Sequence, residues 1–93
     1  MRLDVLATHF IEGSVIIATA GDEYVATFTP RAGHPEPGGQ RRLANREAVA
    51  RFLHEIGIRP GRIVGAMDDL RAAGAAFLPV VLLTPERRRL FEP

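Results

Sequence analysis

The chain has 93 residues, which is the size of one ordinary domain, so we expect a single hydrophobic core. It contains no cysteine, which excludes disulfides, thiolate metal sites and cysteine nucleophiles. Twelve basic and eleven acidic side chains leave a formal net charge of +1, so no strong overall field directs the chain to nucleic acid or to an anionic membrane.

The cellular location is predicted from two features. The chain begins Met1-Arg2-Leu3-Asp4, with an acidic residue where a signal peptide would be apolar. The longest apolar stretch, residues 75–83, contains Pro79 and is much shorter than a membrane span. We therefore expect a cytoplasmic protein that does not cross a membrane.

Three β-strands are expected at the start of the chain, at residues 3–11, 14–20 and 23–29. Gly21-Asp22, between two β-rich runs, is typical of a two-residue hairpin turn, and Glu12-Gly13 is a second candidate turn. Two-residue loops at both places predict an antiparallel meander, in which Phe10 faces Val15 and Val15 faces Phe28.

Both faces of this predicted sheet are apolar. One face carries Leu6, Thr8, Phe10, Val15, Ile17, Thr19, Tyr24, Ala26 and Phe28. The other carries Leu3, Val5, Ala7, His9, Ile16, Ala18, Ala20, Val25 and Thr27. Because a solvated antiparallel sheet alternates apolar and polar residues, this sheet is expected to be covered on both sides.

Residues 30–42 are predicted to form a flexible loop. The segment holds three prolines and three glycines and has no apolar periodicity. Loops of this length in compact domains are either functional or mobile, and the composition leaves both possibilities open.

Two helices are expected within residues 46–73. Asn45 is a favourable N-cap, and apolar residues follow it at helical spacing as far as Gly57, which suits the end of a helix. Pro60 fits the first turn of a second helix, and Gly74 ends that helix.

The end of the chain predicts one more strand and one more helix. Residues 77–83 form a strand in which Pro79 requires an edge position or a later start. Thr84-Pro85-Glu86 then opens a short helix that continues through Phe91. The order β-β-β-α-α-β-α predicts one α+β domain over residues 1–93, with helices packed on one face of a small, mostly antiparallel sheet.

No catalytic residues, metal site or cofactor site are predicted. Ser14 is the only serine, and it lacks the Gly-x-Ser-x-Gly pattern of a hydrolase nucleophile. His9, His34 and His54 match no metal-binding spacing. A small-ligand or acid–base site near His9 and residues 30–42 is the third of three hypotheses for function.

The second hypothesis is a nucleic-acid-binding regulator. The helix pair over residues 46–73 has the outline of a helix-turn-helix, with Arg59 and Arg62 as contacts. Further positive charge would come from an arginine-rich strip made of Arg41, Arg42, Arg87, Arg88 and Arg89. The second helix also shows Asp68 and Asp69, which are unfavourable beside phosphate.

The first hypothesis is a non-enzymatic interaction module that self-associates, because one face of the sheet needs a further cover. A homodimer is the expected assembly, since one self-complementary patch serves both subunits, and another protein partner is possible. The candidate interface residues are Val5, Phe10, Ile17, Tyr24 and Phe28. In a competing account, residues 77–91 cross over and cover the second face within one chain.

Overall fold

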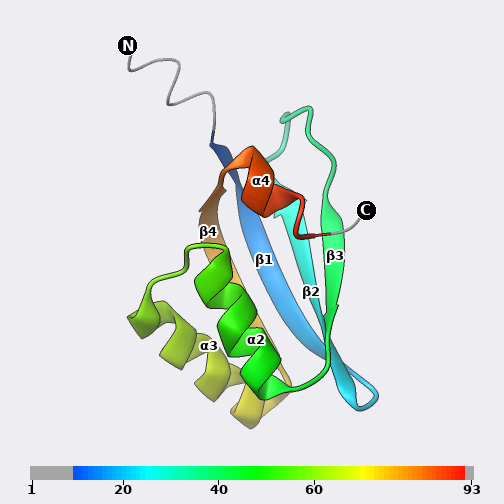
Figure 1. The fold of residues 1–93 in the computed structure, drawn as a ribbon, viewed down its shortest axis with the longest axis vertical. Coiled ribbons are helices and arrows are strands. Elements are labelled where there is room, and N and C mark those ends of the chain that lie inside the picture. The colour runs from blue at the N-terminus through cyan, green and yellow to red at the C-terminus, as the bar shows by residue number, and fades with distance from the viewer. Residues whose placement is uncertain (1–9, 92–93) are drawn as a thin grey trace.

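A four-stranded antiparallel sheet carries the helices of the domain (Figure 1). The computed structural model describes residues 10–91. The elements in chain order are β1 (Ile11–Ala20), β2 (Glu23–Pro30), β3 (Gly39–Leu43), α2 (Arg46–Glu55), α3 (Pro60–Ala73), β4 (Ala75–Leu83) and α4 (Pro85–Arg88). The predicted α+β class, the order of elements and the antiparallel sheet are confirmed.

Strands β1 and β2 form the predicted hairpin. Gly21 in its turn has a φ of 64°, which glycine adopts without the strain that a side chain would bring. Val15 lies opposite Phe28, as the two-residue loop predicted. The local turn signal was therefore sufficient to set the register of this pair.

The predicted turn at Glu12-Gly13 is wrong, because both residues lie inside the unbroken strand β1. A Cβ atom on Gly13 would collide with the carbonyl oxygen of Thr29 and would lie 2.7 Å from the Phe28 ring. Gly13 thus permits a close approach of β2. The predicted pairing of Phe10 with Val15 is wrong for the same reason, and the rest of the first predicted strand, residues 3–9, lies outside the described residues.

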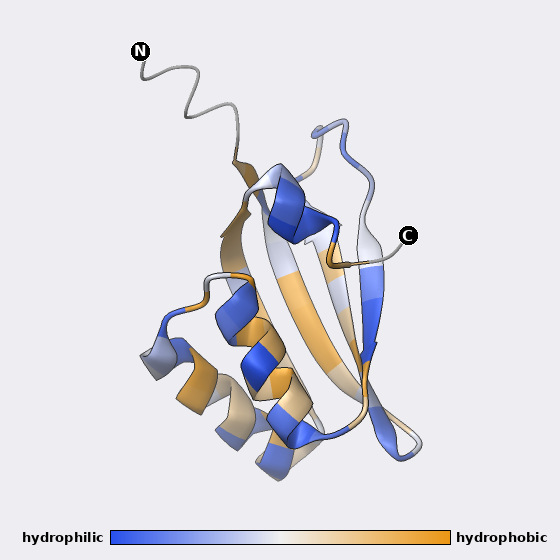
Figure 2. Ribbon diagram, viewed as in Figure 1, coloured by the Kyte–Doolittle hydropathy of each residue, from blue (hydrophilic) through white to orange (hydrophobic). Residues whose placement is uncertain are grey.

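Part of the predicted loop is also a strand. Residues 39–42 pair with β2 as most of β3, whereas residues 31–38 contain only turns and bends. Arg41 and Arg42 point to opposite faces of this edge strand, so no apolar alternation marks it in the sequence. Figure 2 shows β3 as largely hydrophilic.

The sheet order is β3-β2-β1-β4, so β4 is the second edge strand. It begins at Ala75, two residues before the predicted start, and its edge position agrees with the expectation from Pro79. The register with β1 shifts between Gly13 and Val15, so Pro79 and Val80 of β4 lie opposite the single residue Ser14 of β1. Strand β4 therefore contains a β-bulge in its middle.

The helix boundaries follow the predicted capping residues. The Asn45 side chain accepts a hydrogen bond of 2.8 Å from the Ala48 N–H at the start of α2. Gly57 and Gly74, with φ of 90° and 74°, follow the ends of α2 and α3. Pro60 opens α3, and Thr84 caps α4 by accepting a bond from the Arg87 N–H.

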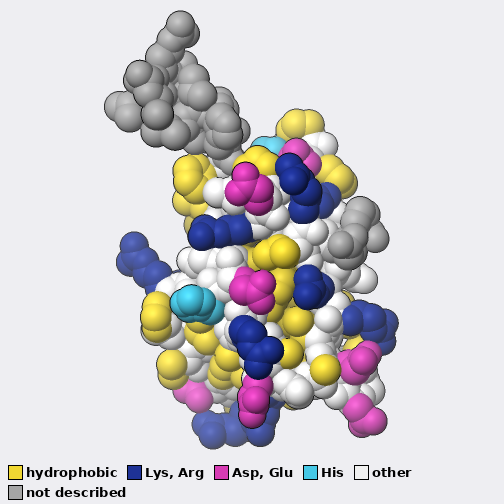
Figure 3. All heavy atoms as spheres, in the orientation of Figure 1, with side chains coloured by type: hydrophobic (Ala, Val, Ile, Leu, Met, Phe, Trp, Pro, Cys, Tyr) yellow, Lys and Arg dark blue, Asp and Glu magenta, His cyan; other side chains and the backbone are white. Residues whose placement is uncertain are grey.

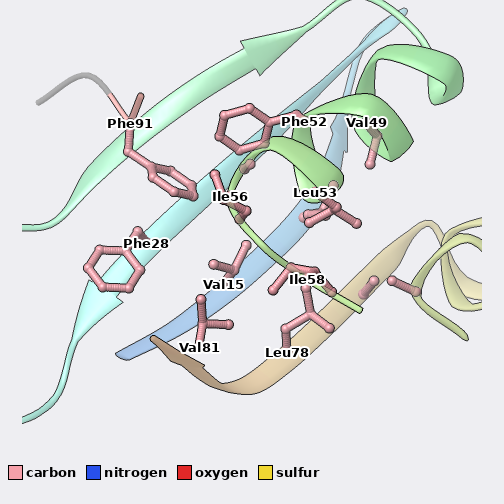
Figure 4. Packing of buried hydrophobic residues seen from close by; sticks show 14 of the residues in the cluster. Val15, Phe28, Val49, Phe52, Leu53, Ile56, Ile58, Leu78, Val81 and Phe91 are labelled. Carbon is pink, nitrogen blue, oxygen red and sulfur yellow. The ribbon is translucent and has the colours of Figure 1, made fainter. Parts of the chain in front are cut away.

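The hydrophobic core lies between one face of the sheet and the helices (Figure 4). Phe91, which follows α4, packs against Phe28 of β2 and Phe52 of α2, with ring centroids 5.6 and 5.0 Å apart. The C-terminal segment thus covers the same face as α2, while residues 77–83 belong to the sheet itself. The competing account, in which residues 77–91 cover the second face, is wrong.

Candidate functional site

The face of the sheet opposite the helices is the main candidate surface, and we call it the open face. Strand register places on it Glu12, Ser14, Ile16, Ala18, Ala20, Glu23, Val25, Thr27, Thr29, Gln40, Arg42, Ala75, Phe77 and Leu82. Their neighbours along each strand point into the core instead. No helix or strand of residues 10–91 covers this face.

Large apolar side chains are exposed along β1 and β4. On the open face, the exposed fraction is 44% for Ile16, 59% for Phe77 and 52% for Leu82. Val80, in the bulge of β4, is 55% exposed. Ile16 and Phe77 lie directly opposite each other on neighbouring strands, so they form one continuous apolar surface.

The β2 and β3 half of the open face is polar. Arg42 Nε lies 3.1 Å from Glu23 Oε1, and this ion pair joins β3 to β2. The Gln40 amide donates a hydrogen bond of 3.4 Å to the Thr27 hydroxyl. We call the β1 and β4 side of the open face, where Glu12 and Ser14 are the polar exceptions, the apolar half. The β2 and β3 side, where Val25 is the apolar exception, is the polar half.

A groove of about 390 Å³ adjoins the apolar half. Alanines from the end of α3 and the start of β4 line it, together with Ile16, Phe77 and Asp69. Four of its seven lining residues are alanines, whose side chains are single methyl groups, so the groove has room for a side chain from outside. We call this hollow the Phe77 groove.

A second hollow, of about 350 Å³, lies where the start of α3 meets the bulge of β4. Arg59 and Arg62 line it beside Val80 and Leu82. The Arg62 guanidinium donates a hydrogen bond of 2.8 Å to the Val80 carbonyl oxygen. Arg62 therefore satisfies a backbone group at the edge of the sheet.

The predicted arginine strip is not one surface. Arg88 is only 7% exposed, and it donates to the carbonyl oxygens of Pro37, Gly38 and Phe91. Arg41 donates a bond of 3.2 Å to the Leu90 carbonyl, and its guanidinium lies 5.5 Å from the centre of the Phe52 ring.

The other predicted arginines are exposed but separated. Arg42 projects from the open face, whereas Arg59 and Arg62 belong to the start of α3. A Cβ on Gly57 would lie 2.7 Å from Arg87 Nη1, so Arg87 reaches the connection between α2 and α3. On the helix side, shown in Figure 3, arginines and carboxylates are interspersed.

The predicted interface residues are only partly at the surface. Ile17 and Phe28 are 0% and 1% exposed beneath the helices, so their assignment to an interface is wrong. Tyr24 packs against the core and is half-buried, while Phe10 is 45% exposed. Val5 lies outside the described residues.

Sequence reasoning missed Phe77, Val80 and Leu82 as surface residues. Their signal was the run of apolar residues at almost every position of 75–83, which marks a strand that is apolar on both faces. Only one of these faces is buried by the helices, with Leu78 and Val81 at 5% and 2% exposure.

The histidines and acidic residues form no assembled site in the described part of the chain. His34 Nδ1 accepts a bond from the Glu36 N–H, and His54 lies in the last turn of α2. His9, named in the third hypothesis, lies outside the described residues. Within residues 10–91, no group of three histidine, aspartate or glutamate side chains is placed to hold a metal ion, and no helix there has the length and apolar character to cross a membrane.

The chain matches no protein-family model, no curated protein and no solved structure. Function is therefore inferred from the surface geometry of the domain.

Proposed function

We propose that this protein is a non-enzymatic interaction module that self-associates through the open face of its sheet. The exposed apolar side chains of Ile16, Phe77 and Leu82 on that face carry the proposal. Monomeric proteins rarely expose apolar patches larger than a few hundred Å², and patches of this kind mark interaction sites.

The size of the open face supports a protein partner. The four strands have 10, 8, 5 and 9 residues, so at about 3.3 Å per residue and about 4.8 Å between strands the open face measures about 500 Å². Two such faces in full contact would remove about 1,000 Å² from water, which is close to the smallest area of a specific interface.

The charges on the open face support a second copy as the partner. Glu23 and Arg42 form an ion pair within the face, and Glu12 lies 3.8 Å from Arg31 at its margin. Because these charges compensate each other locally, the face has no excess of one sign that would repel an identical face.

The nucleic-acid alternative has less support. Arg41 and Arg88 donate to backbone carbonyls of their own chain, so they are not available to phosphate. Along α3, Asp68 and Asp69 are exposed, and a carboxylate beside a phosphate backbone is unfavourable.

Light scattering over a dilution series tests the proposal. We expect a species of twice the 10.2 kDa chain mass at micromolar concentration, which dissociates on dilution. Phe77→Asp should yield a folded monomer, because a carboxylate cannot be buried without a partner. Val64→Asp is the matched control, since Val64 is 61% exposed on α3.

Two outcomes would contradict the proposal. One is a single mass near 10.2 kDa for the unaltered chain at every concentration. The other is an equal loss of association in Phe77→Asp and Val64→Asp, because the effect would then not be specific to the open face. Retention on DNA that falls steeply with salt would instead favour the nucleic-acid alternative.

A further inference from the structure

The apolar half of the open face indicates how two copies would meet. If β4 of one copy lay over β3 of the other, Phe77 would cover Gln40 or Arg42. Burial of a guanidinium or an amide beneath an aromatic ring has a large desolvation cost. An arrangement with β4 against the partner's β4 joins the two apolar halves and leaves more of the polar halves in water. It buries less than the whole open face, which suits a weak dimer that dissociates on dilution.

The edge of β4 is unsuited to a continuous ladder between copies. Pro79 has no N–H to donate, and the bulge at Pro79 and Val80 interrupts the regular spacing of backbone groups. The Val80 carbonyl oxygen already accepts a hydrogen bond from Arg62. Contacts between the copies would therefore come from side chains of the open face and not from extension of the sheet.

Phe77 and the groove beside it form a complementary pair. The ring is 59% exposed, and the groove of about 390 Å³ is larger than one phenylalanine side chain. In a two-fold contact, if residue i of one copy touches residue j of the other, then residue j of the first copy also touches residue i of the second. Phe77 itself lines the groove, so the ring of each copy can enter the groove of the other while the two rings lie side by side near one symmetry axis.

From this geometry, and resting on the proposed self-association, we propose that two copies dock with β4 against β4 and that Phe77 of each copy enters the Phe77 groove of the other. Ala72 of α3 and Ala75 of β4 line that groove, so both lie close to the symmetry axis. Thr29 of β2, in the polar half of the open face, lies outside the contact.

Single cysteines test this arrangement in the full-length protein, which has no cysteine of its own. We expect mild oxidation to link Ala75→Cys into a disulfide dimer, because residues near a two-fold axis lie close to their own copies. Thr29→Cys, also exposed on the open face, is the matched control and should remain monomeric on a non-reducing gel.

A second variant tests the groove without removing Phe77. Ala72 is exposed at the end of α3, so Ala72→Phe should leave the fold intact while its ring fills the groove. We expect its dimer dissociation constant to rise at least tenfold, with an unchanged circular dichroism spectrum. If Ala72→Phe does not fold, the cysteine pair still decides.

The outcomes separate the two proposals. A dimer in which Thr29→Cys is linked and Ala75→Cys is not would overturn this arrangement while self-association stands. The same holds for a dimer whose dissociation constant is unaffected by Ala72→Phe. A chain that stays monomeric without any substitution would overturn the self-association itself, and this arrangement with it.

Discussion

At the scale of single residues, Arg88 connects the 31–38 segment to the end of the described structure. Among residues 10–91, it is the one charged residue that is buried. Its Nε and Nη2 both donate hydrogen bonds to the Pro37 carbonyl oxygen, at 3.1 and 2.8 Å. It also donates to the carbonyl oxygen of Phe91, whose ring lies in the core. One guanidinium therefore holds the 31–38 segment and the C-terminal segment together.

Loss of Arg88 should destabilise the fold. We expect Arg88→Gln to lower the free energy of unfolding in urea by about 2–3 kcal/mol, because three buried or partly buried carbonyl oxygens would lose a charged donor. Arg88→Lys should recover only part of the loss, since an ammonium cannot reproduce the planar set of donors. The neighbouring Arg89 is exposed, and Arg89→Gln should change stability by less than about 0.5 kcal/mol. Equal effects of the two glutamine variants would contradict the structural role of Arg88.

At the scale of elements, local signals were read correctly and contacts between distant segments were not. Asn45, Gly57 and Gly21 act within a few residues of themselves, so the sequence alone predicted the helix ends and the hairpin. The glycine at position 13 resembles a turn residue, but its lack of a Cβ serves the packing of Phe28. This close packing depends on the position of β2, which the residues around Gly13 do not predict.

The difference between local signals and distant contacts also explains why strand β3 and the candidate surface were only partly predicted from the sequence. Strand β3 is held by pairing with β2, and its residues Gln40, Arg41 and Arg42 show no apolar alternation. The sequence predicted that one apolar face would need a cover. Which face the helices leave open is decided by tertiary packing, so the sequence left both faces as candidates. Ile17, named as an interface residue, is buried, and Ile16 is exposed.

Two glycines provide a test of strand packing. Gly13→Ala should destabilise the protein by about 2 kcal/mol or more, because the new methyl group meets the backbone of Thr29, which cannot move aside without separating β1 from β2. Gly65 lies in α3 with open space around it, so Gly65→Ala should stabilise by about 0.5–1 kcal/mol. Urea unfolding measures both changes. A neutral Gly13→Ala would contradict the close approach of the two strands.

At the scale of the whole molecule, the helices cover one side of the sheet and leave large apolar side chains exposed on the other. The core includes Val15 and Phe28 on the covered side, while Phe77 and Leu82 remain exposed on the other. Association would bury the second side and add to the stability of each chain.

Thermal unfolding should therefore depend on protein concentration. We expect the Tm of the unaltered chain to rise by about 3–5 °C for each tenfold increase in concentration, because dissociation accompanies unfolding. The Tm of Phe77→Asp should stay constant over the same range. A concentration-independent Tm for the unaltered chain, at concentrations where light scattering finds dimers, would mean that association contributes nothing to folding.

The hydrogen bond from Arg62 to Val80 also bears on how large an assembly can grow. An unprotected edge strand lets each added chain offer a new edge to the next, which is the route to fibres. With Pro79 and Arg62 interrupting that edge, growth by strand addition is hindered at β4. Contact between faces, in contrast, uses the same patch on both copies and leaves none free for a third. The hindered β4 edge would thus make a closed pair the natural end point of association through the open face.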